Sequence, residues 1–98
     1  MNITKTLNGT ELTVALEGRL DTVTAPEFER ELNKSMEGVK TLTVDLACLE
    51  YISSAGLRAL LSAHKRMLGK DGMVVKNANE IVREVFEVTG FNDVLTIE

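Results

Sequence analysis

Two adjacent serines, Ser53 and Ser54, are the residues of this chain best placed to do chemistry. They follow an apolar segment and stand where a long amphipathic helix is expected to begin. A hydroxyl at that position is exposed and faces unpaired backbone N–H groups and the positive end of the helix dipole. This environment suits a phosphoryl group, so the pattern predicts a serine phosphoswitch. Helix capping alone remains the alternative, since Ser53 is a good N-cap residue.

The two residues after the serines, Ala55 and Gly56, are small. Small side chains leave the backbone open to close approach by another macromolecule. A phosphate on Ser54 would change the surface charge by about −1.5 to −2 at one spot. That change is sufficient to break an interface built on a neutral patch of small residues. We therefore expect a protein-binding surface that is controlled by Ser54.

The sequence argues against catalysis by this serine. Ser54 does not lie in a G-x-S-x-G elbow. The only histidine, His64, is ten residues further along the same expected helix, which is about 15 Å away at 1.5 Å per residue. We interpret it as a helix-packing residue. One histidine and one cysteine offer no zinc site, and no glycine-rich loop is present to hold ATP. We expect no catalytic residue, metal or cofactor.

Charged side chains are expected around the serines. Asp21 follows one expected strand and Asp45 lies near the end of another, so both are expected to approach the Ser54 loop. Two interpretations stay open for them: hydrogen bonding at a turn or strand end, and an acidic rim around the serine. The two carboxylates could in principle serve as the acid and base of glycoside hydrolysis. No aromatic residues accompany them to bind a sugar, so this interpretation is disfavoured. Arg58 lies one turn after Ser54 and is expected to be exposed.

The composition is that of one small globular domain over residues 1–98, with 44% hydrophobic and 27% charged residues. A net charge of −4 argues against nucleic-acid binding, which needs a basic stripe. No segment approaches the roughly 20 apolar residues of a membrane span, so we expect no direct membrane contact. Cys48 is the only cysteine, which indicates a reduced, cytoplasmic setting, and we expect it to be a small buried hydrophobe.

The apolar pattern predicts strands that alternate with helices after an N-terminal hairpin. A capping box from Thr24 to Glu27 is expected to begin the first helix. Asn79 is expected to cap the last helix and Gly90 to end it. The expected strands cover residues 3–7, 12–16 (ending at Gly18), 41–46, 73–76 and 94–97, and the expected helices cover 25–36, 54–68 and 79–90. This order predicts a mixed α/β sheet of four to five strands with the helices mainly on one side.

The chain resembles a STAS domain, specifically a bacterial anti-sigma factor antagonist. The resemblance covers the whole chain and rests on the hairpin, on residues 18–21, and on the segment from Val44 to Leu57 that contains Ile52-Ser53-Ser54-Ala55-Gly56. It implies a STAS fold without enzymatic activity. The unphosphorylated form would bind an anti-sigma factor that is also a GHKL-type serine kinase, and so release the sigma factor. Phosphorylation would end that binding, and a PP2C-type phosphatase would restore it.

The resemblance also implies roles for particular residues. Gly56 matches the glycine of the family's Asp-Ser-Ser-Gly motif, which puts Ser54 at the phosphoacceptor position. Ser53 stands where the family has aspartate and is a second candidate acceptor. The implied partner surface comprises Asp21, Thr22, Thr24, Ser53, Ala55, Gly56, Leu57, Arg58 and Leu61, with Asp45 among the polar residues surrounding the acceptor. The resemblance also implies that the antagonist is a monomer. The alternative is a STAS interaction subunit without a phosphoswitch, in a stress-signalling scaffold or a lipid-transport ABC complex.

Overall fold

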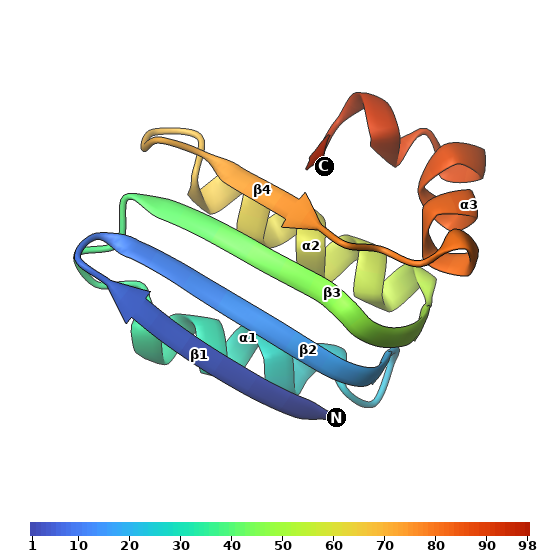
Figure 1. Ribbon diagram of the computed structural model, residues 1–98, viewed down its shortest axis with the longest axis horizontal. Helices are drawn as coiled ribbons and strands as arrows, with labels where there is room; N and C mark the ends of the chain where they lie inside the picture. The colour runs from blue at the N-terminus through green and yellow to red at the C-terminus, as the bar shows by residue number, and fades with distance from the viewer.

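A computed structural model describes residues 1–98 as a five-stranded sheet with helices packed on one face (Figure 1). The strands lie in chain order, and only the first pair is antiparallel. Parallel neighbours need a crossover connection, and each crossover here contains a helix. The elements are β1 (Asn2–Asn8), β2 (Glu11–Leu20), α1 (Ala25–Ser35), β3 (Thr41–Ile52), α2 (Ser54–Arg66), β4 (Met73–Lys76), α3 (Glu80–Thr89), the 3-10 helix η1 (Phe91–Asp93) and β5 (Thr96–Ile97). The predicted fold class is confirmed.

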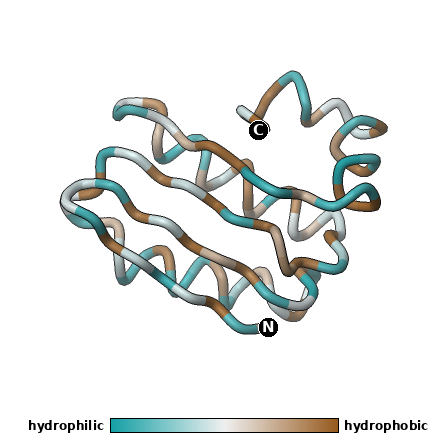
Figure 2. Tube along the Cα trace, viewed as in Figure 1, coloured by the Kyte–Doolittle hydropathy of each residue, from teal (hydrophilic) through white to brown (hydrophobic).

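The core lies between the sheet and the helices. Hydrophobic and hydrophilic residues alternate along the central strands (Figure 2), and the apolar positions Leu12, Val14 and Leu42 are at most 2% exposed. The helices α1 and α2 lie behind the sheet in Figure 1, while α3 stands beyond the end of β4. The 24 residues of the core are all apolar. No helix combines the length and the apolar character needed to cross a membrane.

The strands β2 and β3 run well past the ends that the sequence analysis predicts. Gly18 does not end β2, which continues to Leu20; the glycine adopts φ +108° and marks a shift in the pairing with β3. The strand β3 does not stop at Leu46 but runs to Ile52. The expected loop before the serines is therefore mostly strand. Both central strands consequently carry the chain directly to the edge of the sheet where the serines lie.

Cys48 is exposed, so the prediction of a buried cysteine is wrong. The pairing of β2 with β3 explains the error. Ala15 pairs with Asp45 and Glu17 pairs with Cys48, so β3 contains one residue more than β2 in this interval. Such a bulge shifts the alternation of the side chains. Leu49 then occupies the buried position, and Cys48 points away from the core.

The helix boundaries agree well with the prediction. Asn79 caps α3 by accepting a hydrogen bond from the amide of Val82 at 2.8 Å, and Gly90 ends it in the left-handed conformation at φ +79°. The helix α2 ends at Arg66, two residues before the predicted Leu68. Leu68 is 68% exposed and lies outside the core.

Candidate functional site

The carboxyl ends of β2 and β3 bring two connections together. Leu20 pairs with Ile52 at the last step of the parallel ladder, and the amide of Ser53 donates a hydrogen bond to the carbonyl of Leu20 at 2.9 Å. The turn from β2 to α1 and the junction from β3 to α2 are therefore neighbours at one edge of the sheet (Figure 1). Of the two aspartates expected here, the turn contains only Asp21.

Ser53 is the N-cap of α2, as predicted. Its backbone is extended, at φ −99° and ψ 178°, and its Oγ accepts a hydrogen bond from the amide of Gly56 at 3.3 Å. Its carbonyl accepts from the amide of Leu57 at 2.9 Å. These bonds satisfy donors of the first helical turn, which has no preceding carbonyls to pair with. The hydroxyl of Ser53 is thus engaged in holding the helix end.

Ser54 is the first residue of α2 and is exposed. Its hydroxyl makes no hydrogen bond within the protein. Its amide is among the first N–H groups of the helix, which have no carbonyl of the same helix to donate to. The first turn of α2 contains no acidic residue. A negative group on Ser54 would therefore meet the positive end of the helix and no carboxylate of the same turn. Of the two serines, Ser54 has the free and accessible hydroxyl.

Gly56 is buried, and it permits close packing within the chain instead of contact with a partner. A Cβ on this residue would lie 2.5 Å from the carbonyl oxygen of Leu20 and 2.8 Å from Cγ1 of Ile52. Only a glycine lets the start of α2 approach the end of β2 so closely. Leu57 is 5% exposed and belongs to the core. The expectation that these two residues form partner surface is wrong; Ala55 and Leu61 are half-buried, and Arg58 is exposed.

The turn from β2 to α1 is held by Asp21. Its Oδ1 accepts hydrogen bonds from the amides of Val23 at 3.0 Å and Thr24 at 3.1 Å. Thr24 forms no side-chain cap of α1, so the predicted capping box is wrong. Its Oγ1 instead donates to the carbonyl of Arg19 at 2.7 Å and accepts from the amide of Asp21 at 2.9 Å. Four residues of chain are thus fixed by their own polar groups.

The carboxyl group of Asp21 is an anion at neutral pH. The hydrogen bond from the amide of Thr24 lowers the pKa of Asp21, and the bonds from Val23 and the nearby Arg19 act in the same direction. The Nε of Arg19 lies 3.7 Å from Oδ2 of Asp21, and the guanidinium carbon lies 4.4 Å from the centroid of the Tyr51 ring. Arg19 thus connects the aspartate with β3 on this edge of the sheet.

Val23 is a surface residue that the sequence analysis did not single out. Its side chain is 84% exposed, the highest value among the large hydrophobic residues. It lies between the polar Thr22 and Thr24 in the turn beside the serines. A β-branched apolar residue in a short polar turn was the available signal, because such a residue gains nothing from contact with water.

Asp45 and His64 lie away from the serines. Asp45 is in the middle of β3, where its Oδ1 accepts from the amide of Ala47 at 3.0 Å and from Nδ2 of Asn77 at 3.1 Å. It precedes Ile52 by seven residues, about 20 Å along a strand. The prediction that Asp45 approaches Ser54 is wrong. His64 is half-buried on α2, with a buried Nδ1 that has no hydrogen-bond partner.

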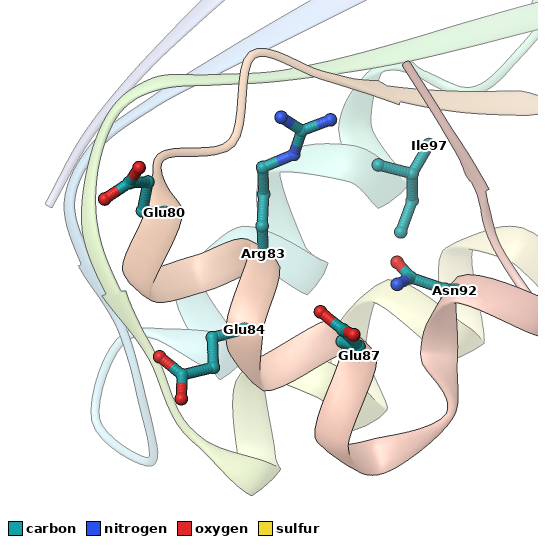
Figure 3. A pocket seen from close by; sticks show the side chains of 6 residues that line it. All are labelled: Glu80, Arg83, Glu84, Glu87, Asn92 and Ile97. Carbon is teal, nitrogen blue, oxygen red and sulfur yellow. The ribbon is translucent and has the colours of Figure 1, made fainter.

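The largest surface hollow, of about 780 Å³, lies elsewhere, between α3 and β5. Its lining has a single apolar residue, Ile97, and the rest are Glu80, Arg83, Glu84, Glu87 and Asn92. Figure 3 shows the side chains of Glu80 and Glu84 pointing away from Arg83, so the polar groups do not converge on one point. A ligand pocket is typically apolar with a few convergent polar groups, and this open groove has neither property.

Known proteins resemble this chain in sequence and in fold. The STAS domain model matches residues 2–98. BtrV of Bordetella bronchiseptica, an anti-sigma factor antagonist by name, is 35% identical over 88% of this chain and 76% of its own length. The crystal structure of an anti-sigma factor antagonist from Mycobacterium paratuberculosis has a TM-score of 0.88 at 22% identity, covering 98% of this chain and 83% of that one. Bacillus SpoIIAA in its phosphorylated form has a TM-score of 0.75 at 16% identity, covering 99% and 91%.

Proposed function

The chain belongs to the STAS domain family, in the group of the anti-sigma factor antagonists, and from this premise we propose that it is an antagonist switched by phosphorylation of Ser54. The unphosphorylated form binds an anti-sigma factor that is also a GHKL-type serine kinase, and this binding releases the sigma factor. The kinase phosphorylates Ser54 and thereby ends the interaction. A PP2C-type phosphatase removes the phosphate. The chain acts as one STAS domain in the cytoplasm, as a monomer and without a cofactor or an activity of its own.

The single observation that carries the proposal is the free hydroxyl of Ser54 at the start of α2, beside the turn of Asp21. A kinase must reach the hydroxyl, and an exposed side chain without internal hydrogen bonds meets that need. The cap of α2 belongs to Ser53, so modification of Ser54 leaves the helix end intact. The fold therefore survives phosphorylation, and only the surface changes.

Phosphorylation acts on binding through charge. A phosphoserine adds about −1.5 to −2 charges at neutral pH, next to a turn that already carries the anion of Asp21. A partner surface that fits the neutral serine must then desolvate a new anion or lose the contact. The mechanism needs no movement of the backbone. It is supported by the structural likeness to SpoIIAA, whose fold exists in a phosphorylated form.

Ser54 is preferred to Ser53 as the acceptor for a structural reason. The Oγ of Ser53 accepts the amide of Gly56, and the residue is partly buried. A kinase would have to break this bond to reach the Oγ of Ser53, and phosphorylation there would alter the cap of α2. The proposed partner surface consists of the turn from Asp21 to Thr24, with the exposed or half-buried residues Ser54, Ala55, Arg58 and Leu61.

The test starts with affinity capture from native cell lysate by wild-type protein and the variants Ser54→Ala and Ser54→Asp. The captured kinase is then purified and incubated with each protein and ATP, and the phosphorylated residue is identified by mass spectrometry. We expect wild type and Ser54→Ala to bind, Ser54→Asp to bind poorly, and phosphate to appear on Ser54 alone. Equal binding of Ser54→Asp and wild type would contradict the charge mechanism. Capture of the same scaffold or transporter subunits by all three proteins would indicate the constitutive STAS subunit instead.

A further inference from the structure

Arg58 is the only cation in the first two turns of α2. The helix has no other basic residue before its last turn, where His64, Lys65 and Arg66 follow one another. Arg58 is exposed and takes part in none of the four ion pairs of the molecule. A free guanidinium of this kind has all its donors available to a planar or tetrahedral anion.

The spacing between Ser54 and Arg58 is four residues, so the two side chains lie on the same face of α2. In this arrangement the residue that would become an anion is N-terminal to the cation, which is the favoured orientation of an i,i+4 pair. Arginine binds phosphate oxygens with two parallel N–H donors, and such bonds are stronger than those between neutral groups. No carboxylate in the first turn of α2 competes for Arg58.

We infer that Arg58 is the intramolecular counter-ion of phosphorylated Ser54, an inference that rests on the proposed function. The modification then changes the surface in two ways at once. It adds the phosphate, and it converts a cation that is free in the unphosphorylated form into one half of an ion pair. A partner that uses Arg58 for its own carboxylates loses that contact as well. Arg58 is thus a positioning residue of the switch.

Two other charged residues come from the end of β2 and the turn after it, which lie beside the start of α2. These are Asp21, whose anion opposes a second negative group, and Arg19, which lies beside Asp21 and Tyr51. Because Arg19 already pairs with Asp21, its guanidinium is not free to neutralise a phosphate fully. Both remain unchanged when Arg58 is substituted, so their effect on the phosphate cancels in a comparison of variants.

The test measures the second pKa of a phosphoserine placed at position 54 of the full chain during translation. ³¹P NMR titration is done on the phosphorylated wild type, Arg58→Gln, Arg58→Lys and the control Lys65→Gln. The control removes one positive charge from the same helix, but Lys65 is eleven residues from Ser54, about 16 Å at the helical rise, beyond the screening length of about 8 Å. Circular dichroism confirms that each variant is folded.

We expect the phosphate pKa to be lower in the wild type than in Arg58→Gln by about 0.3 or more. Arg58→Lys should recover part of this difference, and Lys65→Gln should match the wild type. Equal phosphate pKa values in wild type and Arg58→Gln would overturn the inference. The proposed function is judged separately, by binding of the kinase to the same phosphorylated wild-type protein, so that a failure of one is distinct from a failure of the other.

Discussion

At the scale of single residues, Gly56 controls how closely α2 approaches β2. Replacement by alanine would put a Cβ 2.5 Å from the backbone oxygen of Leu20, which has no flexible end to move aside. We expect Gly56→Ala to lower the free energy of unfolding by about 1–3 kcal/mol. Urea denaturation measures the loss. Gly69→Ala is the matched control, because nothing lies within 4 Å of a Cβ there; an equal loss in both variants would contradict the packing argument.

Asp21 is a second residue whose role is local and testable. Amide hydrogen bonds in the native turn lower its pKa below the ordinary value of 3.8, and the bond from Thr24 contributes most. The unfolded state therefore binds a proton at a higher pH than the native state does. The stability that the carboxylate contributes is present above the unfolded pKa and is lost as the pH falls through the lower native pKa. The turn is thus a source of acid sensitivity.

We expect Asp21→Asn to be less stable than the wild type at pH 7, and the difference to shrink as the pH falls below 3.8. Urea denaturation of both proteins across this range measures the effect. A difference between them that is independent of pH would mean that the side-chain shape, and not its charge, holds the turn.

At the scale of the elements, the turn from β2 to α1 presents Val23 to solvent on a rigid frame. Its amide is fixed by Asp21, and its side chain is 84% exposed. A rigid apolar residue beside the site is suited to act as an anchor in a partner's pocket, because little conformational freedom is lost on binding. We expect Val23→Thr, which keeps the shape, to weaken binding of the anti-sigma kinase about tenfold without changing the free energy of unfolding. Calorimetric titration and urea denaturation test the two parts.

The control for this prediction is Val88→Thr, because Val88 is 79% exposed on α3 outside the proposed partner surface. Equal weakening by both substitutions would mean that exposed apolar side chains contribute nonspecifically. No weakening by Val23→Thr would remove the turn from the binding surface.

Element boundaries were predictable where they depend on local signals. The cap at Asn79 and the stop at Gly90 act within a few residues of chain, and both agree with the structure. The ends of β2 and β3 were not predictable, because a strand continues wherever a neighbouring strand offers hydrogen bonds. The false capping box at Thr24 has a related cause: Asp21 accepts the amide of Thr24 that Glu27 would accept in such a box, and the hydroxyl of Thr24 bonds Arg19 and Asp21 instead.

The residues of the candidate site were likewise predictable only where local signals decide their positions. The sequence sufficed to place Ser53 at the cap and Ser54 on the surface, because both follow from the start of a helix. The burial of Gly56 and the distance of Asp45 depend on how β2, β3 and α2 pack, which no local pattern encodes. The spacing of Leu57 from Leu60 and Leu61 does indicate a buried side chain, and the structure buries it. Val23 was missed because its exposure is a property of the assembled turn.

At the scale of the whole molecule, α1 and α2 cover one face of the sheet and leave the other without a helix (Figure 1). Cys48 stands on that side, at the bulge of β3, and is exposed. An accessible thiol reacts without prior unfolding, whereas a buried one must wait for the protein to open.

We expect Cys48 of the native protein to react with a thiol reagent at a rate within about tenfold of its rate in denaturant. Each rate is first divided by the rate of a small free thiol in the same solvent. Dependence of the native rate on the free energy of unfolding, measured with the destabilised Gly56→Ala variant, would contradict this. The same rate in both proteins would show that Cys48 is accessible in the native state on the face of the sheet that no helix covers, as expected from the bulge of β3.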